Sequence, residues 1–223
     1  MGQHGDWYVF RINQAQPVLI LVIEPYDAEP ATRNNAVKYS DHALGEFFAK
    51  AQQSSYWDNT IFLVIADHDA RVESSMPVPV KHFHIPALIL GKDITPKVDE
   101  RIASSLDMPV TLLSLAGVDV TSPMLGNDLS KPLAGQFLRA MMQFGNNFGY
   151  LDEQGLVVLQ PEQAPHMFAY QGVNQPLRPI PSVTEQVALA QAHALLGNYL
   201  YGQQLYRDLV EPAITKESIQ QWQ

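Results

Sequence analysis

The first half of the chain alternates short apolar runs with longer stretches of helical pattern. Residues 17–23 and 61–66 are uncharged and rich in Ile, Leu, Val and Phe, which is typical of strands buried on both faces. Between them, apolar residues recur at helical spacing from 35 to about 53, and Asn34 or Asn35 is placed to cap the helix. A strand, a crossover helix and a strand in this order predict a right-handed, parallel unit.

The same alternation continues to about residue 117. A third apolar run, 85–90, predicts a strand that ends at Gly91. Residues 108–116 predict a short apolar helix, with Asp107 as its N-cap and Gly117 to stop it. The predicted fold class is therefore α/β, a mostly parallel sheet sandwiched by helices.

After residue 140 the pattern becomes that of antiparallel strands. Short apolar runs occur at 141–144, 148–151 and 156–159, and the last two are joined by the turn 152–155. The proline-rich segment 161–181 predicts irregular structure in which 167–170 is a candidate edge strand.

The last third of the chain ends in a predicted helix. Residues 182–185 (SVTE) match a capping box that opens a long helix running to about Tyr206. We therefore expect two parts: a partial α/β domain over 1–135, and antiparallel strands plus a helix over 136–223, packed on the first part.

The amino-acid composition of the chain argues against several classes of function. The net charge of -9 over 223 residues argues against binding to nucleic acid or anionic lipid, and it fits small substrates or metal ions better. The absence of cysteine excludes disulfides, thiolate metal sites and a cysteine nucleophile. The aliphatic run 18–23 is too short to cross a bilayer, so any membrane contact is expected only through segments outside this chain.

The strongest candidate chemistry lies directly after the run 61–66, where Asp67 and His68 follow the strand. Ligands collect at the carboxyl ends of parallel strands, and the two side chains can reach one ion if the chain bends away from the sheet between them. A carboxylate and an imidazole suit Zn, Mn or a similar cation, although two ligands are an incomplete set. The alternative is that Asp67 caps the next turn and His68 bonds locally.

Other polar residues are candidates for the same site. His82 and His84 would share a face in a strand and could meet one ion or anion, or could be partly buried polar groups. Arg71 could clamp an oxyanion or form a surface ion pair. Glu24 and Asp27 could approach the same crevice, or serve turn chemistry beside the proline between them.

Several motifs occur in an order that is informative as a set. They are residues 34–41 (NNAVKYSD), 56–62 (YWDNTIF), 66–68 (ADH), 84–90 (HIPALIL), Asp107 with 111–117 (TLLSLAG), and 126–129 (GNDL). Over residues 17–130 this order resembles the carboxyl-terminal half of the sulfatases and lipoteichoic-acid-synthase-like phosphoglycerol transferases, which belong to the alkaline phosphatase superfamily.

The resemblance implies a partial alkaline phosphatase-like domain and a metal-dependent hydrolase or transferase of sulfuric or phosphoric esters. Asp67 and His68 would complete a site for a divalent cation, whether Mn, Zn, Mg or Ca. Arg71 and His84 would contact a small anionic ester substrate. The family also implies a location in the cell envelope, on the periplasmic or extracellular face of the inner membrane.

The catalytic hydroxyl of such enzymes comes from their amino-terminal half, and this sequence has no match to that segment. The sulfatase signature of Cys or Ser followed by x-Pro-x-Arg is also absent, since residues 75–77 (SMP) lack the Arg. We therefore expect the isolated chain to be inactive. The alternative is a non-catalytic relative that binds a partner or an anion. The sequence leaves the oligomeric state open.

Overall fold

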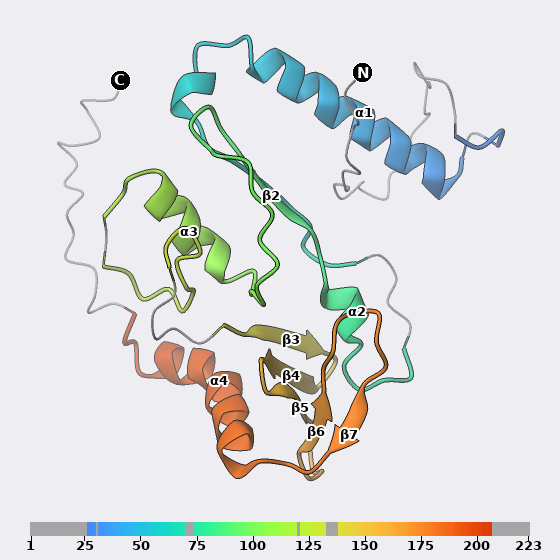
Figure 1. The fold of residues 1–223 in the computed structure, drawn as a ribbon, viewed down its shortest axis with the longest axis vertical. Helices are drawn as coiled ribbons and strands as arrows, with labels where there is room; N and C mark the ends of the chain where they lie inside the picture. The colour runs from blue at the N-terminus through green and yellow to red at the C-terminus, as the bar shows by residue number, and fades with distance from the viewer. Residues whose placement is uncertain (1–25, 30, 70–73, 120, 133–137, 207–223) are drawn as a thin grey trace. The chain divides into compact units, whose positions relative to one another are not determined.

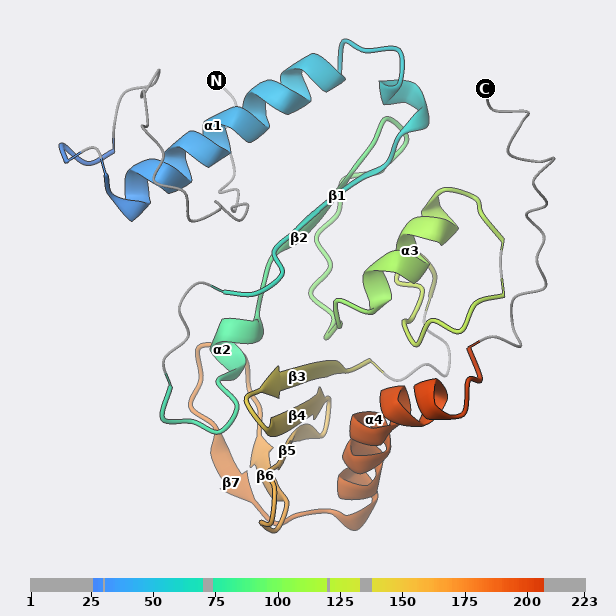
Figure 2. The same ribbon diagram turned by 180° about the vertical axis from the view of Figure 1, so that it is seen from behind.

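The computed structural model describes residues 26–29, 31–69, 74–119, 121–132 and 138–206, and the chain divides into two compact units (Figures 1 and 2). Unit 1 is Met1–Ala70 with His84–Lys97, and unit 2 is Arg71–Phe83 with Val98–Gln223. The predicted strand 17–23 and the predicted domain boundary at residue 135 both lie outside the described residues.

The described residues of unit 1 form one long helix and a two-stranded sheet. In chain order its elements are α1 (Arg33–Ala51), the 3-10 turn η1 (Trp57–Asn59), β1 (Phe62–Ile65) and β2 (Ala87–Leu90). The helix and both strands lie where the sequence predicts them. The predicted cap of α1 is wrong, because Thr32 is the N-cap and its Oγ1 accepts a hydrogen bond from the Asn35 amide at 3.2 Å.

The Asn35 side chain is instead buried, and it holds the loop before α1. Its Oδ1 accepts hydrogen bonds from the amides of Tyr26 and Asp27, at 2.7 and 3.0 Å. Its Nδ2 donates to the carbonyl oxygens of Asp27 and Glu29, at 3.0 and 2.8 Å. A buried amide that makes all of these bonds fixes the backbone of residues 26–29 at the start of the helix.

The predicted parallel sheet is wrong for the strands that the structure describes. β1 pairs antiparallel with β2, with Phe62 opposite Leu90 and Ile65 opposite Ala87 (Figure 2). An uninterrupted apolar run indicates that a strand is buried on both faces, and such strands occur most often in parallel sheets. It carries no information on strand direction, which the path of the chain between β1 and β2 sets.

Unit 2 is built on a five-stranded antiparallel sheet in the order β3-β4-β5-β6-β7. The strands are β3 (Ala140–Phe144), β4 (Asn147–Asp152), β5 (Gly155–Leu159), β6 (His166–Ala169) and β7 (Arg178–Ile180). The helices are α2 (Val80–Phe83), α3 (Asp107–Leu115) and α4 (Thr184–Gly202). Strands β3, β4 and β5 and the terminal helix follow the prediction. The predicted edge strand 167–170 corresponds to β6. It lies inside the sheet, because β7, which the sequence did not predict, pairs with its other side.

Both faces of this sheet are covered, which explains its near-continuous apolar runs. Along β5, Val157 joins Tyr150 and Ala190 of α4 in one cluster, while the neighbouring Leu156 joins Val78 and its surroundings in another. Alternate residues of a strand point to opposite faces, so α4 covers one face and the segment 78–83 the other. The predicted capping box of α4 is wrong, because its N-cap Val183 makes no side-chain cap bond.

The region from α3 to the start of β3 is held by a buried ion pair. Asp107 is the first residue of α3 rather than its N-cap, and it is fully buried. Its Oδ1 accepts from Arg139 Nη1 at 2.9 Å and from the Asn127 amide at 2.7 Å, and its Oδ2 accepts from the Ser104 amide at 2.7 Å. Arg139 Nη2 also donates to the Leu125 carbonyl oxygen at 2.6 Å. This carboxylate therefore joins three separate segments of unit 2.

Candidate functional site

The predicted metal ligands lie at the exposed end of the β1–β2 ribbon, directly after β1. The side chains of Asp67 and His68 are each 70% exposed. The Oδ1 of Asp67 accepts a hydrogen bond from the adjacent His68 amide at 2.9 Å. The other oxygen, Oδ2, lies 3.4 Å from His68 Nε2. One carboxylate thus bonds the backbone amide of the next residue and faces the imidazole of that residue.

A backbone carbonyl selects the tautomer of the His68 ring. His68 Nδ1 lies 2.7 Å from the Asp69 carbonyl oxygen. A carbonyl oxygen only accepts, so this hydrogen bond requires the proton on Nδ1. In the neutral ring the lone pair is then on Nε2, the atom that faces Asp67. A histidine that donates Nδ1–H to a carbonyl and offers Nε2 is a common arrangement of metal-binding histidines.

The separation of the two candidate ligand atoms matches the edge of a metal coordination sphere. Bonds of about 2.1 Å from nitrogen and oxygen to one ion, at about 109°, place the two ligand atoms about 3.4 Å apart. Asp67 Oδ2 and His68 Nε2 lie at this separation, 3.4 Å. The pair therefore fits two positions of a divalent cation. Among the described residues, no group of three or more carboxylate and imidazole side chains lies close enough to hold a metal ion.

The antiparallel register brings the start of β2 to the same end of the ribbon. Ile65 lies opposite Ala87, so the residues after β1 and those before β2 are neighbours along the ribbon. His84 is exposed three residues before β2 and belongs to unit 1, as do Asp67 and His68. Sequence order alone did not predict this placement, because a parallel strand would have put His84 at the opposite end.

The other predicted candidates divide between local roles and undescribed positions. His82 is the third residue of the helix α2 and not part of a strand, so the predicted shared strand face with His84 is wrong. Asp27 serves turn chemistry, since its Oδ2 accepts a hydrogen bond from Thr32 Oγ1 at 2.7 Å. Arg71 and Glu24 lie outside the described residues.

Two polar residues that the sequence analysis did not single out are strongly held in unit 2. Arg139 is the buried ion-pair partner of Asp107. The sequence signal that could have found it is a single charged residue directly before an apolar strand. Burial raises the pKa of the Asp128 carboxyl, but hydrogen bonds from Ser114, Ser130 and Lys131 outweigh burial and hold that pKa well below its usual range. Both residues stabilise the loop between α3 and β3.

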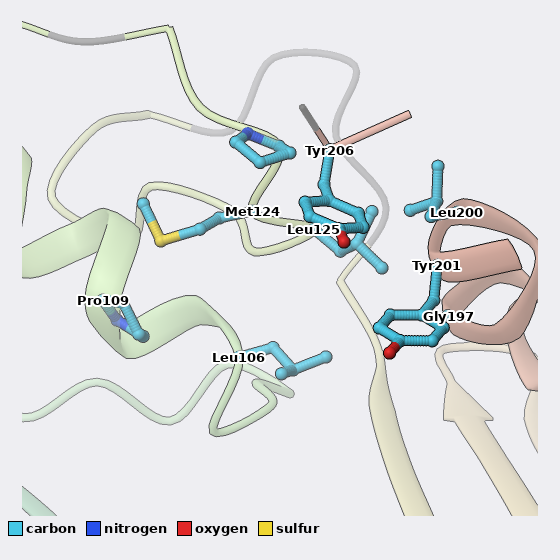
Figure 3. A pocket seen from close by; sticks show the side chains of 9 residues that line it. Leu106, Pro109, Met124, Leu125, Gly197, Leu200, Tyr201 and Tyr206 are labelled. Atoms are coloured by element: carbon cyan, nitrogen blue, oxygen red, sulfur yellow. The ribbon is translucent and has the colours of Figure 1, made fainter. Parts of the chain in front are cut away.

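An apolar pocket of about 320 Å³ lies in unit 2 (Figure 3). Leu106 and Pro109 at the start of α3, Met124 and Leu125 of the following loop, and Tyr201 at the end of α4 contribute to its walls. Its lining includes no carboxylate, imidazole or cationic side chain. The polar side-chain groups in its lining are the hydroxyls of Tyr201 and Tyr206, so the carboxylate and imidazole candidates lie at the ribbon end instead.

Three comparisons identify relatives of the chain. Residues 10–118 match the sulfatase family. Over 83 residues, the chain is 40% identical to phosphoglycerol transferase I of Xanthomonas euvesicatoria pv. vesicatoria (strain 85-10) and 39% identical to phosphoglycerol transferase I of Xanthomonas axonopodis pv. citri (strain 306). These matches cover 36% of this chain and 12% of each relative.

A solved structure extends the likeness to most of the chain. The crystal structure of a protein in the alkaline phosphatase superfamily from Vibrio parahaemolyticus is 56% identical and gives a TM-score of 0.78. The match covers 82% of this chain and 45% of that one, so the chain spans less than half the length of this relative.

Within the part of the chain that the structure describes, no helix has both the length and the apolar character needed to span a bilayer. The Asp-His pair lies inside the matched range 10–118, and the likeness to the Vibrio protein extends beyond it. Residues 10–118 of the chain therefore resemble the sulfatase family, and most of the chain resembles a protein in the alkaline phosphatase superfamily.

Proposed function

We propose that this chain supplies part of the metal site and of the anion site of an enzyme that hydrolyses or transfers a sulfuric or phosphoric ester. The observation that carries the proposal is the separation of 3.4 Å between Asp67 Oδ2 and His68 Nε2, with the His68 tautomer set by the Asp69 carbonyl. The resemblance of residues 10–118 to the sulfatase family supplies the reaction class. The phosphoglycerol transferases among the relatives favour a phosphate ester, and the family name favours a sulfate ester.

Each residue has a defined task in this proposal. Asp67 and His68 would hold a divalent cation, which lowers the pKa of a hydroxyl nucleophile and neutralises ester oxygens when it is bound. His84, at the same end of the ribbon, and Arg71 would donate hydrogen bonds to the non-bridging oxygens of the substrate. The nucleophile itself is expected on an amino-terminal segment that this sequence does not match. As in the family, we expect the enzyme to work in the cell envelope.

The proposal is tested by the effect of Mn²⁺ on thermal unfolding of the full chain. Binding at ten times the dissociation constant stabilises by about 1.4 kcal/mol, which raises the Tm of a protein of this size by about 3–6 °C. We expect this rise in the wild type and its loss in Asp67→Ala, because one of two ligands is removed.

The chain contains a matched control, a second Asp-His dipeptide at Asp41 and His42. It lies on α1, where His42 Nε2 faces Glu46 Oε1 at 3.6 Å rather than its neighbour. Asp41→Ala therefore keeps the Mn²⁺ shift of the wild type. Equal Mn²⁺-induced Tm shifts in the wild type and Asp67→Ala would contradict a metal site at Asp67 and His68. No shift in any protein would favour the non-catalytic relative.

A further inference from the structure

Residues 77–83, which we call the anchor segment, are packed on the antiparallel sheet of unit 2. Val78 is 1% exposed, and it lies with Val80 and Leu156 of β5 in one core cluster. Phe83, at the end of α2, packs against the same cluster, and α2 lies beside the sheet in both views (Figures 1 and 2). These apolar contacts fix the anchor segment on the sheet.

Two features of β4 fit this segment closely. Asn147 Nδ2 donates a hydrogen bond to the Pro77 carbonyl oxygen at 2.9 Å. Gly149 lies against Val78, and a Cβ at Gly149 would come within 2.9 Å of Val78 Cγ1, a separation that a side chain does not tolerate. Glycine weakens a strand interior and often marks a close approach of another segment. The strand therefore has a polar contact and a space that both match the anchor segment.

The anchor segment ends at the residue before His84. Phe83 is the last residue of this part of unit 2, and His84 is the next residue and belongs to unit 1. Strand β2 begins at Ala87. Between them, Pro86 has a fixed φ and restricts the residue before it to extended conformations. The stretch 84–86 is thus short and stiff, with the anchor segment at one end and a paired strand at the other.

We propose that the anchor segment is a positioning element for His84, so that the sheet of unit 2 contributes to binding of a tetrahedral oxyanion, phosphate or sulfate, by that histidine. The inference rests on the proposed function, in which His84 donates a hydrogen bond to the non-bridging oxygens of the ester. A side chain on a restricted backbone loses less conformational entropy when it binds a ligand, so restriction raises the affinity.

The same reasoning separates anion binding from cation binding. Asp67 and His68 directly follow β1, and they precede the anchor segment in the chain. Their separation of 3.4 Å involves neighbouring residues and a local hydrogen bond to the Asp67 carboxylate. Loosening the anchor segment should therefore weaken anion binding and leave Mn²⁺ binding unchanged, whereas general damage to the fold would weaken both.

The experiment measures both affinities in the full chain and in Asn147→Ala. Phosphate is titrated and followed by the NMR signals of the His84 ring, and Mn²⁺ is titrated separately by electron paramagnetic resonance of the free ion. Loss of the bond to Pro77 should weaken phosphate binding at least about threefold, as expected for one neutral hydrogen bond. Sulfate should show the same relative loss, because the anchor segment acts on His84 and not on the anion.

A second measurement reports the positioning directly. Amide ¹⁵N relaxation should give lower order parameters at His84 and Ile85 in Asn147→Ala than in the wild type, with unchanged values in β1. Asn147→Asp keeps the shape of the side chain and removes its donor, so it should behave as Asn147→Ala does. Gly149→Ala, which would displace Val78, should weaken phosphate binding by at least as much.

The same hairpin provides a matched control. Gln143 Nε2 donates to the Gly145 carbonyl oxygen at 2.7 Å, which is also a bond from a side-chain amide to a backbone carbonyl, but one that does not involve the anchor segment. Gln143→Ala should therefore bind phosphate and Mn²⁺ as the wild type does.

The outcomes separate this inference from the proposed function. If His84→Ala loses phosphate binding but Asn147→Ala binds phosphate as the wild type does, the inference is overturned and the proposed role of His84 stands. Equal losses of phosphate and Mn²⁺ affinity in Asn147→Ala would also overturn the inference. A wild type that binds neither phosphate nor sulfate, or a His84→Ala variant that binds them normally, would contradict the anion site of the proposed function, and the inference would fail with it.

Discussion

The buried pair of Asp107 and Arg139 gives the sharpest prediction for stability. Both side chains are at most 5% exposed, and their Oδ1 and Nη1 atoms lie 2.9 Å apart. Arg139→Met keeps most of the aliphatic stem and removes the guanidinium, which leaves a buried carboxylate whose remaining bonds are to the Ser104 and Asn127 amides. Breaking a buried ion pair from one side costs about 3–5 kcal/mol, and we expect a loss in this range.

The assay is urea unfolding followed by circular dichroism, as a double-mutant cycle with Asp107→Ala. The double variant should lose about 1.5–3 kcal/mol less than the sum of the two single variants, because each single variant leaves the other charge buried and unpaired. Arg178→Ala, at an exposed position of β7 in the same unit, should leave the midpoint unchanged. A loss below about 1 kcal/mol for Arg139→Met, or strict additivity, would refute the reasoning.

Three further predictions follow from single side chains. Asp128→Asn should lower the free energy of unfolding by about 1–3 kcal/mol at pH 7. Because the folded-state pKa of Asp128 is lowered, the stability difference between wild type and variant should shrink as the pH falls below about 4, and a difference that stays constant with pH would contradict this role. Asn35→Ala should destabilise unit 1 by about 1–3 kcal/mol and speed proteolysis at residues 26–29, and unchanged cleavage would contradict this role. Gly126→Ala should destabilise the protein by more than about 1 kcal/mol, because a Cβ there would lie 2.0 Å from the Leu106 carbonyl oxygen. Gly197→Ala on α4, where a Cβ would meet open space, should stabilise it by about 0.5–1 kcal/mol. Similar urea midpoints for the two variants would contradict this packing at Gly126.

The sequence predicted the positions of elements better than their pairing. Apolar runs located β1 and β2, and short runs with turn residues located β3, β4 and β5. Direction was wrong for β1 and β2 because a strand buried on both faces shows the same pattern in either orientation. The caps were wrong at α1, α3 and α4. Thr32 caps α1, whereas Leu106 and Val183, which precede α3 and α4, make no side-chain cap bond, so these two helices begin without the signal that the prediction relied on.

The sequence was enough to name the candidate site residues, but it gave only part of their arrangement in space. The sequence pattern showed that Asp67 and His68 follow a strand. It did not show how their side chains face one another, which depends on the local bond between the Asp67 Oδ1 and the His68 amide. The placement of His84 at the same end of the ribbon follows from the antiparallel register, which the sequence did not reveal. The burial of Asp107 with Arg139 joins residues far apart in the chain, and no local pattern reports such a pair.

The central claim is that Asp67 and His68 bind one divalent cation together. Pulsed electron paramagnetic resonance of Mn²⁺ added to the full chain detects the coupling of the ion to a directly bound imidazole nitrogen. We predict that this coupling is present in the wild type and in His42→Ala and absent in His68→Ala. A Mn²⁺ signal without histidine coupling, or a coupling that survives His68→Ala, would contradict the account.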